Sequence, residues 1–278
     1  MLAEEPITRL IWKLSLPAMM GMFVNAMYNL VDTIYIGHGV GPMGIAGLSV
    51  AFPIQMIMGG TGAMFGIGAA SIISRALGAR DYSRAEYAFG NNLLAVMIVG
   101  SSVLGLGTIF LDELLRLFGA TDAILPYARE YLGIILYGAP LIMFTMSMNN
   151  VIRSEGAARV AMWSMVIAGM ANIILDPVFI FTLNMGIRGA AWATVLSRFL
   201  TVGWIYWYFR FGKSALSFGL RYMKPAFRIL REMVTIGFPM LVRHASSSFV
   251  FGLVNHLTVF YGGDMAVALF GINNRAVF

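Results

Sequence analysis

The stretch LIWKLSLPAMMGMFVNAMYNLVDTIYIG, from Leu10 to Gly37, is almost entirely apolar and long enough to cross a bilayer. It contains one proline, Pro17, and one carboxylate, Asp32. The residues that precede Asp32 by successive helical turns are polar: Asn29 or Tyr28, and then Asn25. A carboxylate inside a membrane helix costs roughly 2.5–3.5 kcal/mol on translocon scales. We therefore expect Asp32 to face protein or water and to have a function.

The composition of the 278-residue chain is that of a membrane protein. Hydrophobic residues make up 59% of the chain and charged residues 12%, whereas a soluble domain carries about 25% charged residues. The absence of cysteine excludes disulfides and cysteine metal sites. A net charge of +6 is compatible with nucleic-acid binding, but the distribution of the basic residues indicates membrane topology instead. The expected partner is a lipid bilayer, with no nucleic acid.

The apolar runs predict an all-α, polytopic membrane bundle. The expected spans are residues 10–37, 43–73, 87–110, 124–151, 160–183, 187–211, 232–261 and a last one from about 265. The second span holds a dense set of glycines that would let helices approach closely: Gly59, Gly60, Gly62, Gly66 and Gly68. Most lysines and arginines lie before the first span and in the even-numbered loops. By the positive-inside rule, the N-terminus and the connection 212–231 are cytoplasmic.

A weak long repeat divides the chain. Pro17 aligns with Pro239. The same offset aligns three further pairs: Gly41 with Gly263, Ile45-Ala46 with Val267-Ala268, and Asp32 with Val254. Because six spans separate the copies, the repeat is parallel, an arrangement that some transporters use. We expect a complete N-terminal six-helix lobe (1–211), a cytoplasmic basic linker (212–231) and the first two helices of a C-terminal lobe (232–278), so that the chain would be a fragment of a longer protein.

A second polar group lies on the fifth span. Asn172 and Asp176 are four residues apart, so their side chains point to one side of a helix. Pro177 removes a backbone donor and tends to kink that helix. A structural alternative is that Asp176 caps a helix end near the outer surface. A second buried carboxylate in the same bundle, Asp32, favours a functional role instead.

Other polar residues within the spans have both functional and structural interpretations. Thr194 and Arg198 are four residues apart on the sixth span, but a lone threonine usually bonds its own backbone and a membrane arginine more often pairs with a carboxylate or reaches the interface. Tyr131 and Asn149 lie on the fourth span, where Asn149 either lines a cavity or bonds a neighbouring helix. The histidines lack metal-like spacing and no P-loop is present, so neither an enzyme nor an ATP-driven pump is predicted.

Three features together resemble the multidrug and toxic compound extrusion (MATE) family, and its prokaryotic members most closely. They are the first-helix pattern of Pro17 and Asp32, the Asn172–Asp176–Pro177 motif with Thr194, and the parallel six-plus-six repeat. The resemblance covers the whole chain. It implies a cation-coupled antiporter of the cell (inner) membrane that exports organic cations or drugs in exchange for protons or sodium. It also implies no cofactor, and a monomer at full length.

The resemblance also implies roles for individual residues. A proton or sodium site would consist of Asp32, Asn172, Asp176 and Thr194. A substrate cavity would include Asn25, Tyr28, Tyr131 and Asn149. Pro17 would be the hinge at which the first helix bends.

The residues themselves are compatible with ion coupling. Two carboxylates in a low-dielectric pocket cannot both ionise cheaply, so the pair of Asp32 and Asp176 would share a proton or hold a hard cation such as sodium. Two alternatives remain. A lipid-linked oligosaccharide flippase of the same superfamily would need basic residues facing its cavity, for which Arg198, Arg243 and Arg275 are the candidates. A membrane scaffold without transport activity would leave the buried carboxylates unexplained.

Overall fold

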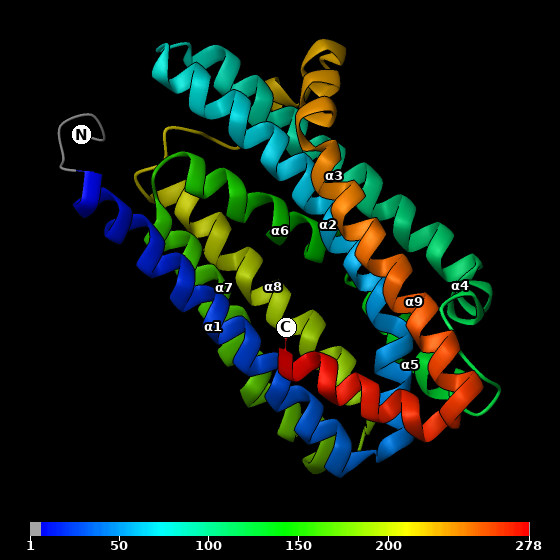
Figure 1. The fold of residues 1–278 in the computed structure, drawn as a ribbon. Coiled ribbons are helices and arrows are strands. Elements are labelled where there is room, and N and C mark those ends of the chain that lie inside the picture. The colour runs from blue at the N-terminus through cyan, green and yellow to red at the C-terminus, as the bar shows by residue number, and fades with distance from the viewer. Residues whose placement is uncertain (1–6, 278) are drawn as a thin grey trace.

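The computed structural model describes residues 7–277, which form a helical bundle without strands (Figure 1). The α-helices are α1 (Ile7–Gly39), α2 (Pro42–Gly78), α3 (Tyr82–Ile109), α4 (Leu111–Leu117), α5 (Leu125–Tyr137), α6 (Ala139–Ser154), α7 (Ala158–Pro177), α8 (Ile187–Phe211) and α9 (Phe227–Val277). A π-helical turn, η1 (Val178–Thr182), follows α7, and a 3-10 turn, η2 (Leu220–Met223), precedes α9. The expectation of an all-α polytopic bundle is confirmed.

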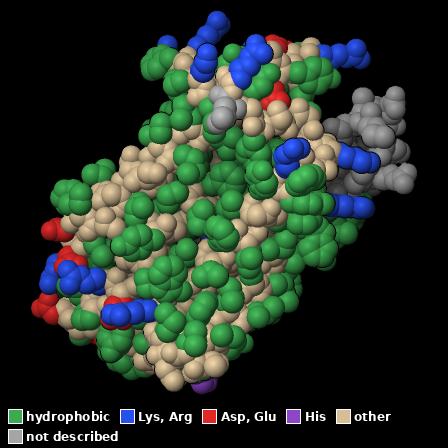
Figure 2. Space-filling view, turned by 180° about the vertical axis from the view of Figure 1, so that it is seen from behind, with side chains coloured by type: hydrophobic (Ala, Val, Ile, Leu, Met, Phe, Trp, Pro, Cys, Tyr) green, Lys and Arg blue, Asp and Glu red, His purple; other side chains and the backbone are tan. Residues whose placement is uncertain are grey.

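Among the described residues, four helices are long and apolar enough to cross a membrane: α2, α3, α7 with η1, and α9. The bent pair of α5 and α6 makes a fifth if it is one span. The helices α1 and α8 are not in this group, and both carry polar residues of the site described below. Figure 2 shows the apolar side chains as a broad band, with the charged side chains gathered toward the two ends of the bundle.

Two of the predicted spans are interrupted where the sequence places glycine or proline. The fourth span consists of α5 and α6, which meet at Gly138 with a bend of 59°. Pro140 in the first turn of α6 has no N–H to continue the ladder of α5. At the other break, α7 ends at Pro177 and the chain continues as the π-helical turn η1. Both breaks lie next to helices that carry polar residues.

The backbone repeats the same break in both copies of the predicted repeat. Gly41, between α1 and α2, has φ 92° and ψ −173°. Its aligned partner Gly263 has φ 68° and ψ −173°, and it divides α9 into two helical segments. Figure 1 shows α9 running beside α2 and then turning back sharply. Positive φ favours glycine, so the glycine pair explains why the break recurs.

The glycines of α2 allow close approach to two neighbouring helices, as predicted. A Cβ added at Gly62 would lie 2.7 Å from the carbonyl oxygen of Met143 in α6. A Cβ added at Gly68 would meet the carbonyl oxygen of Met233 in α9. Gly59 faces open space instead. The small residues therefore fix the spacing of α2 against α6 and α9.

A proline in α2 creates a polar contact with α9. Pro53 has no N–H, so the carbonyl of Ser49 one turn earlier lacks its intrahelical donor. Asn255 of α9 donates its Nδ2 to the Ser49 oxygen at 3.3 Å. Ser248 of α9 donates to the carbonyl of Pro53 itself at 2.8 Å. The carbonyl that the proline leaves without a donor is thus satisfied by the neighbouring helix.

The loops gather at the ends that the charge pattern predicts. Arg75 in the last turn of α2 and Arg84 in the first turn of α3 each contact Glu232 near the start of α9 at 2.9 Å. At the opposite end, Arg129 pairs with Asp112 at 2.7 Å, and Thr121 donates to an Asp264 carboxylate oxygen at 2.9 Å. The end rich in basic residues therefore includes the connection 212–231. Its orientation toward the cytoplasm remains a prediction.

Glu155, in the loop between α6 and α7, forms hydrogen bonds with the end of α8 and with the connection between α8 and α9. Its carboxylate accepts hydrogen bonds from Ser214 Oγ at 2.8 Å, from Ala215 N at 2.9 Å and from Tyr208 Oη at 3.2 Å. Burial raises the pKa of this carboxyl above its ordinary value of 4.5, against the opposing effect of the hydrogen bonds. The connection is thereby held against the end of the bundle.

We expect Glu155→Gln to change how stability depends on pH. Because the folded state holds the Glu155 proton more tightly, the stabilisation is complete below pH 4.5 and is lost as the pH rises through the raised folded pKa. The difference in melting temperature, taken as the unmodified protein minus Glu155→Gln, should therefore fall as the pH rises through the raised pKa of Glu155. Thermal unfolding in detergent across this range measures it, with the exposed Glu113→Gln as control. A constant difference would contradict the prediction.

Candidate functional site

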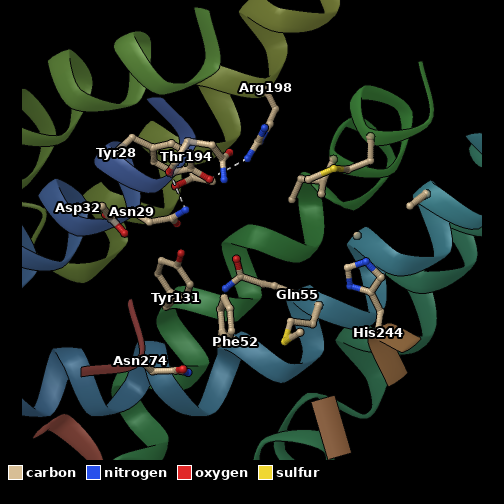
Figure 3. A pocket seen from close by; sticks show the side chains of 16 residues that line it. Tyr28, Asn29, Asp32, Phe52, Gln55, Tyr131, Thr194, Arg198, His244 and Asn274 are labelled. Atoms are coloured by element: carbon tan, nitrogen blue, oxygen red, sulfur yellow. Dashed lines mark hydrogen bonds between the residues drawn. The ribbon is translucent and has the colours of Figure 1, made fainter. Parts of the chain in front are cut away.

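A cavity of about 320 Å³ lies between α1, α2, α5, α6, α8 and α9. We call it the polar cavity because side chains from five of these helices bring polar groups to its wall (Figure 3). Its polar lining residues are Asn25, Tyr28, Asn29, Asp32, Gln55, Tyr131, Thr194, Arg198, His244 and Asn274. Methionine, phenylalanine and other apolar residues complete the wall. An apolar cavity with a few converging polar groups is typical of a small-molecule site.

The polar stripe of α1 has the predicted position. Asn25, Tyr28, Asn29 and Asp32 all line the polar cavity. Asn29 donates its Nδ2 to the Asn25 carbonyl at 2.8 Å, and Thr33 donates to the Asn29 carbonyl at 2.8 Å. These bonds within one helix satisfy several polar groups locally. Because the four residues line the cavity, the stripe faces away from lipid, as an apolar environment requires.

Four residues from three helices meet at one side of the polar cavity, and we call them the carboxylate cluster: Asp32, Asn172, Asp176 and Thr194. Asn172 donates its Nδ2 to Asp176 Oδ1 at 3.2 Å and contacts Thr194 Oγ1 at 3.4 Å. The carboxyl groups of Asp32 and Asp176 are close enough to interact with each other. The structure thus brings together the four residues expected to form the ion site.

The carboxylate cluster is shielded from solvent. Asp176 is 0% exposed, Asn172 1% and Asp32 4%. Asn172 Oδ1 is buried and has no hydrogen-bond donor among the described residues. A buried acceptor without a donor carries an energetic penalty, which a proton or a hard cation near these oxygens would relieve. The donor set therefore fits either a shared proton or a sodium ion.

The structure corrects the expectation for Asn149. This residue is not among the described lining of the polar cavity. It donates its Nδ2 to the Ala161 carbonyl at 2.9 Å and to Ser164 Oγ at 2.8 Å, both in α7. An amide in lipid gains from satisfying its donors on a neighbouring helix. Asn149 therefore joins α6 to α7, which is the structural alternative.

Pro17 and Arg198 have the following positions. Pro17 lies inside α1, which continues as helix from Ile7 to Gly39. Its role as a hinge stays a prediction. Arg198 does not pair with a carboxylate among the described residues. It donates Nη2 to Tyr28 Oη at 3.1 Å instead (Figure 3).

Sequence reasoning missed three residues of the polar cavity as site residues. Gln55 comes from α2, and His244 and Asn274 come from α9. Gln55 stands out in the sequence as an amide within an apolar run. His244 and Asn274 gave no comparable signal. They reach the cavity because α9 packs along α2 and then turns back at Gly263 (Figure 1).

A helical membrane bundle with a polar cavity between its helices is the arrangement that membrane transporters use for a small-molecule site. In the described part of the chain, no cluster of three or more His, Cys, Asp or Glu side chains could hold a catalytic metal. The model of the MatE family matches residues 17–178. Since this match covers more than half of the chain, the chain belongs to the multidrug and toxic compound extrusion family.

Similar proteins give the same assignment. The multidrug export protein MepA of Staphylococcus aureus (strain MRSA252) is 29% identical over 274 residues, which are 99% of this chain and 60% of MepA. The structure of the MATE multidrug transporter DinF-BH matches with a TM-score of 0.92 and 41% identity, over 98% of this chain and 61% of that chain. An inward-facing multidrug resistance MATE transporter matches with a TM-score of 0.87 and 34% identity, over 96% of this chain and 60% of that one. The chain thus spans about three-fifths of the length of these relatives.

Proposed function

We propose that this chain forms the ion-coupling part of a secondary antiporter that exports organic cations or drugs in exchange for protons or sodium ions. The observation that supports this proposal is the carboxylate cluster beside the polar cavity. Asp32 belongs to both, since it interacts with Asp176 and lines the cavity wall. A single residue can therefore respond to an ion on one side and to a substrate on the other.

The mechanism follows from the charge of the cluster. With no ion bound, the negative charge of Asp32 and Asp176 attracts an organic cation into the cavity. A proton or sodium ion that binds at the cluster neutralises this charge and lowers the affinity for the cation. Such a mutual effect is a coupling free energy of typically 1–3 kcal/mol. We propose further that Pro17 is the point at which α1 bends, because proline removes a helical hydrogen bond there.

Alternating access requires two lobes that move against each other. We propose that residues 1–211 form one lobe, that 212–231 form a cytoplasmic linker and that residues from 232 onward begin the second lobe. The N-terminus would be cytoplasmic, and the full-length protein would act as a monomer in the cell membrane. The names of the relatives support export of drugs, since MepA is a multidrug export protein.

Two rival functions differ in their chemistry. A flippase for lipid-linked oligosaccharides would need several basic groups in the cavity to hold phosphates. Among the described residues, Arg198 is the only arginine or lysine in the lining, and the side chain of Arg275 lies outside them. A membrane scaffold would not need the buried carboxylates, which are costly in lipid.

Transport by the full-length protein in proteoliposomes tests the proposal. An imposed proton or sodium gradient should drive accumulation of a fluorescent organic cation, measured by quenching, and the gradient that drives it identifies the coupling ion. Collapse of the gradient with an ionophore should stop the transport. Movement of a labelled lipid-linked sugar without any gradient would support the flippase instead. No transport of either probe would support the scaffold.

A further inference from the structure

A second hollow in the bundle lies between α1 and α7, apart from the polar cavity, and we call it the α1–α7 groove. The two helices pack side by side (Figure 1). The groove has a volume of about 220 Å³. Its described lining consists of Trp12, Leu16, Pro17, Met20, Arg159 and Met162. The wall is therefore apolar apart from one guanidinium.

The α1–α7 groove opens on the side of α1 that faces away from the polar cavity. Trp12, Leu16 and Met20 are four residues apart, so they form a stripe along the helix. At about 3.6 residues per turn, this stripe lies opposite the polar stripe that ends at Asp32. The three side chains are 62%, 49% and 53% exposed. In a membrane bundle, an exposed apolar face of this kind meets acyl chains.

The groove lies at the end of the bundle that is rich in basic residues. Arg159 is in the first turn of α7. The loop just before it contains Glu155, which contacts the connection between α8 and α9. Trp12 is near the start of α1, and tryptophan is enriched where a bilayer meets water. Both side chains are thus placed at the depth of lipid headgroups.

The charge of Arg159 is not compensated within the described part of the chain. The side chain is exposed and is not a member of any ion pair among the described residues. Glu155, one helical turn earlier in the sequence, accepts hydrogen bonds from Ser214, Ala215 and Tyr208 instead. An accessible guanidinium matches the geometry of a phosphate group, with which it forms two parallel hydrogen bonds.

We propose that the α1–α7 groove binds an anionic phospholipid, with the phosphate on Arg159 and an acyl chain along Trp12, Leu16 and Met20. The apolar wall suits the chain, and the guanidinium suits the negative headgroup at the same end. Trp12 and Leu16 precede Pro17, whereas Met20 follows it. One acyl chain would therefore contact α1 on both sides of the proline and join both parts to α7. The inference does not depend on the proposed export function.

Two phospholipids with the same acyl chains and different headgroup charge test the inference. Native mass spectrometry of the full-length protein in detergent, titrated with phosphatidylglycerol or phosphatidylcholine, gives the number of bound lipids and their affinities. The unmodified protein should bind one phosphatidylglycerol about fivefold more tightly than phosphatidylcholine, which corresponds to about 1 kcal/mol for one basic residue near the membrane surface. Arg159→Gln should remove this preference and leave the affinity for phosphatidylcholine unchanged.

Three further variants make the result specific to the groove. Arg159→Lys keeps the charge, so it should keep most of the preference, and it serves if Arg159→Gln does not fold. Met162→Trp fills the groove and should weaken binding of both lipids. The matched control is Arg221→Gln, an exposed arginine of η2 at the same end of the bundle and outside the groove lining. This control should keep the full preference.

Each remaining outcome would overturn the inference. Equal affinity of the unmodified protein for the two lipids would do so, as would an unchanged preference in Arg159→Gln. Unchanged lipid binding in Met162→Trp would show that the acyl chain lies elsewhere. An equal loss of preference in Arg221→Gln would indicate attraction by the whole basic end. Displacement of phosphatidylglycerol by an equal concentration of soluble glycerol 3-phosphate would show that the apolar groove does not contribute.

Discussion

Ion-driven efflux by the full-length protein is expected to fall by about tenfold or more when Asp176 is replaced by asparagine, because the coupling between ion and substrate is lost. Asp176 is fully buried and interacts with both Asn172 and Asp32. Asparagine has nearly the same shape, so the helix packing should persist. The measurement is accumulation of an organic cation in proteoliposomes under an imposed ion gradient, with binding of the same cation measured in parallel.

Asp32 and Asp176 should behave as one functional unit. Asp32→Asn is expected to lower ion-driven efflux to a similar extent, and the double variant should be no worse than the more impaired single variant, since residues that act together are strongly non-additive. The matched control is Asp122→Asn, whose side chain is 89% exposed and pairs with Arg116 at the surface. Full ion-driven efflux in Asp32→Asn or Asp176→Asn would remove that residue from the mechanism.

The second large effect is expected from the contact between α2 and α9. In Gly68→Ala the new methyl group would meet the carbonyl oxygen of Met233. Backbone atoms cannot rotate away as a side chain does, so the helices must separate. Overpacking of this kind typically lowers stability by about 1–3 kcal/mol. The melting temperature of the full-length protein in detergent should fall, and the yield of monodisperse protein with it.

A glycine in the same helix provides the control for this prediction. Gly59 has no heavy atom within 4 Å of an added Cβ, so Gly59→Ala adds helix propensity without a clash. It should leave the melting temperature unchanged or slightly higher. Since Gly59 lines the polar cavity, this control is used for stability alone. Equal melting temperatures of the two variants would show that α2 and α9 do not depend on close approach at Gly68.

Local features of the sequence predicted much of the fold. Apolar runs set the long helices, and the repeat aligned Gly41 with Gly263, the two positions at which the structure has breaks with similar backbone angles. Pro177 predicted the interruption at the end of α7, where a π-helical turn follows. Hydropathy and backbone dihedrals depend on the residue and its near neighbours. For this reason they can be derived without knowledge of the packing.

The carboxylate cluster was accessible from the sequence for a related reason. A carboxylate in an apolar helix must be buried in protein, and the spacing of Asn172 and Asp176 put both on one side. The spacing alone did not bring Asp32 to them. That expectation came from the resemblance to a known family, and the structure places the three side chains together.

The sequence by itself determined the long apolar helices and which side chains are too polar to face lipid. It did not predict the short helix α4 or the 59° bend between α5 and α6. The tertiary structure decided which partner each polar side chain meets. Asn149 bonds α7 instead of facing the cavity, Asn255 reaches the carbonyl that Pro53 leaves without a donor, and Arg198 contacts Tyr28 with no carboxylate partner among the described residues. These choices depend on how each helix is rotated and how closely it approaches its neighbours. Rotation and approach follow from the packing of the whole bundle, which no single stretch of sequence encodes.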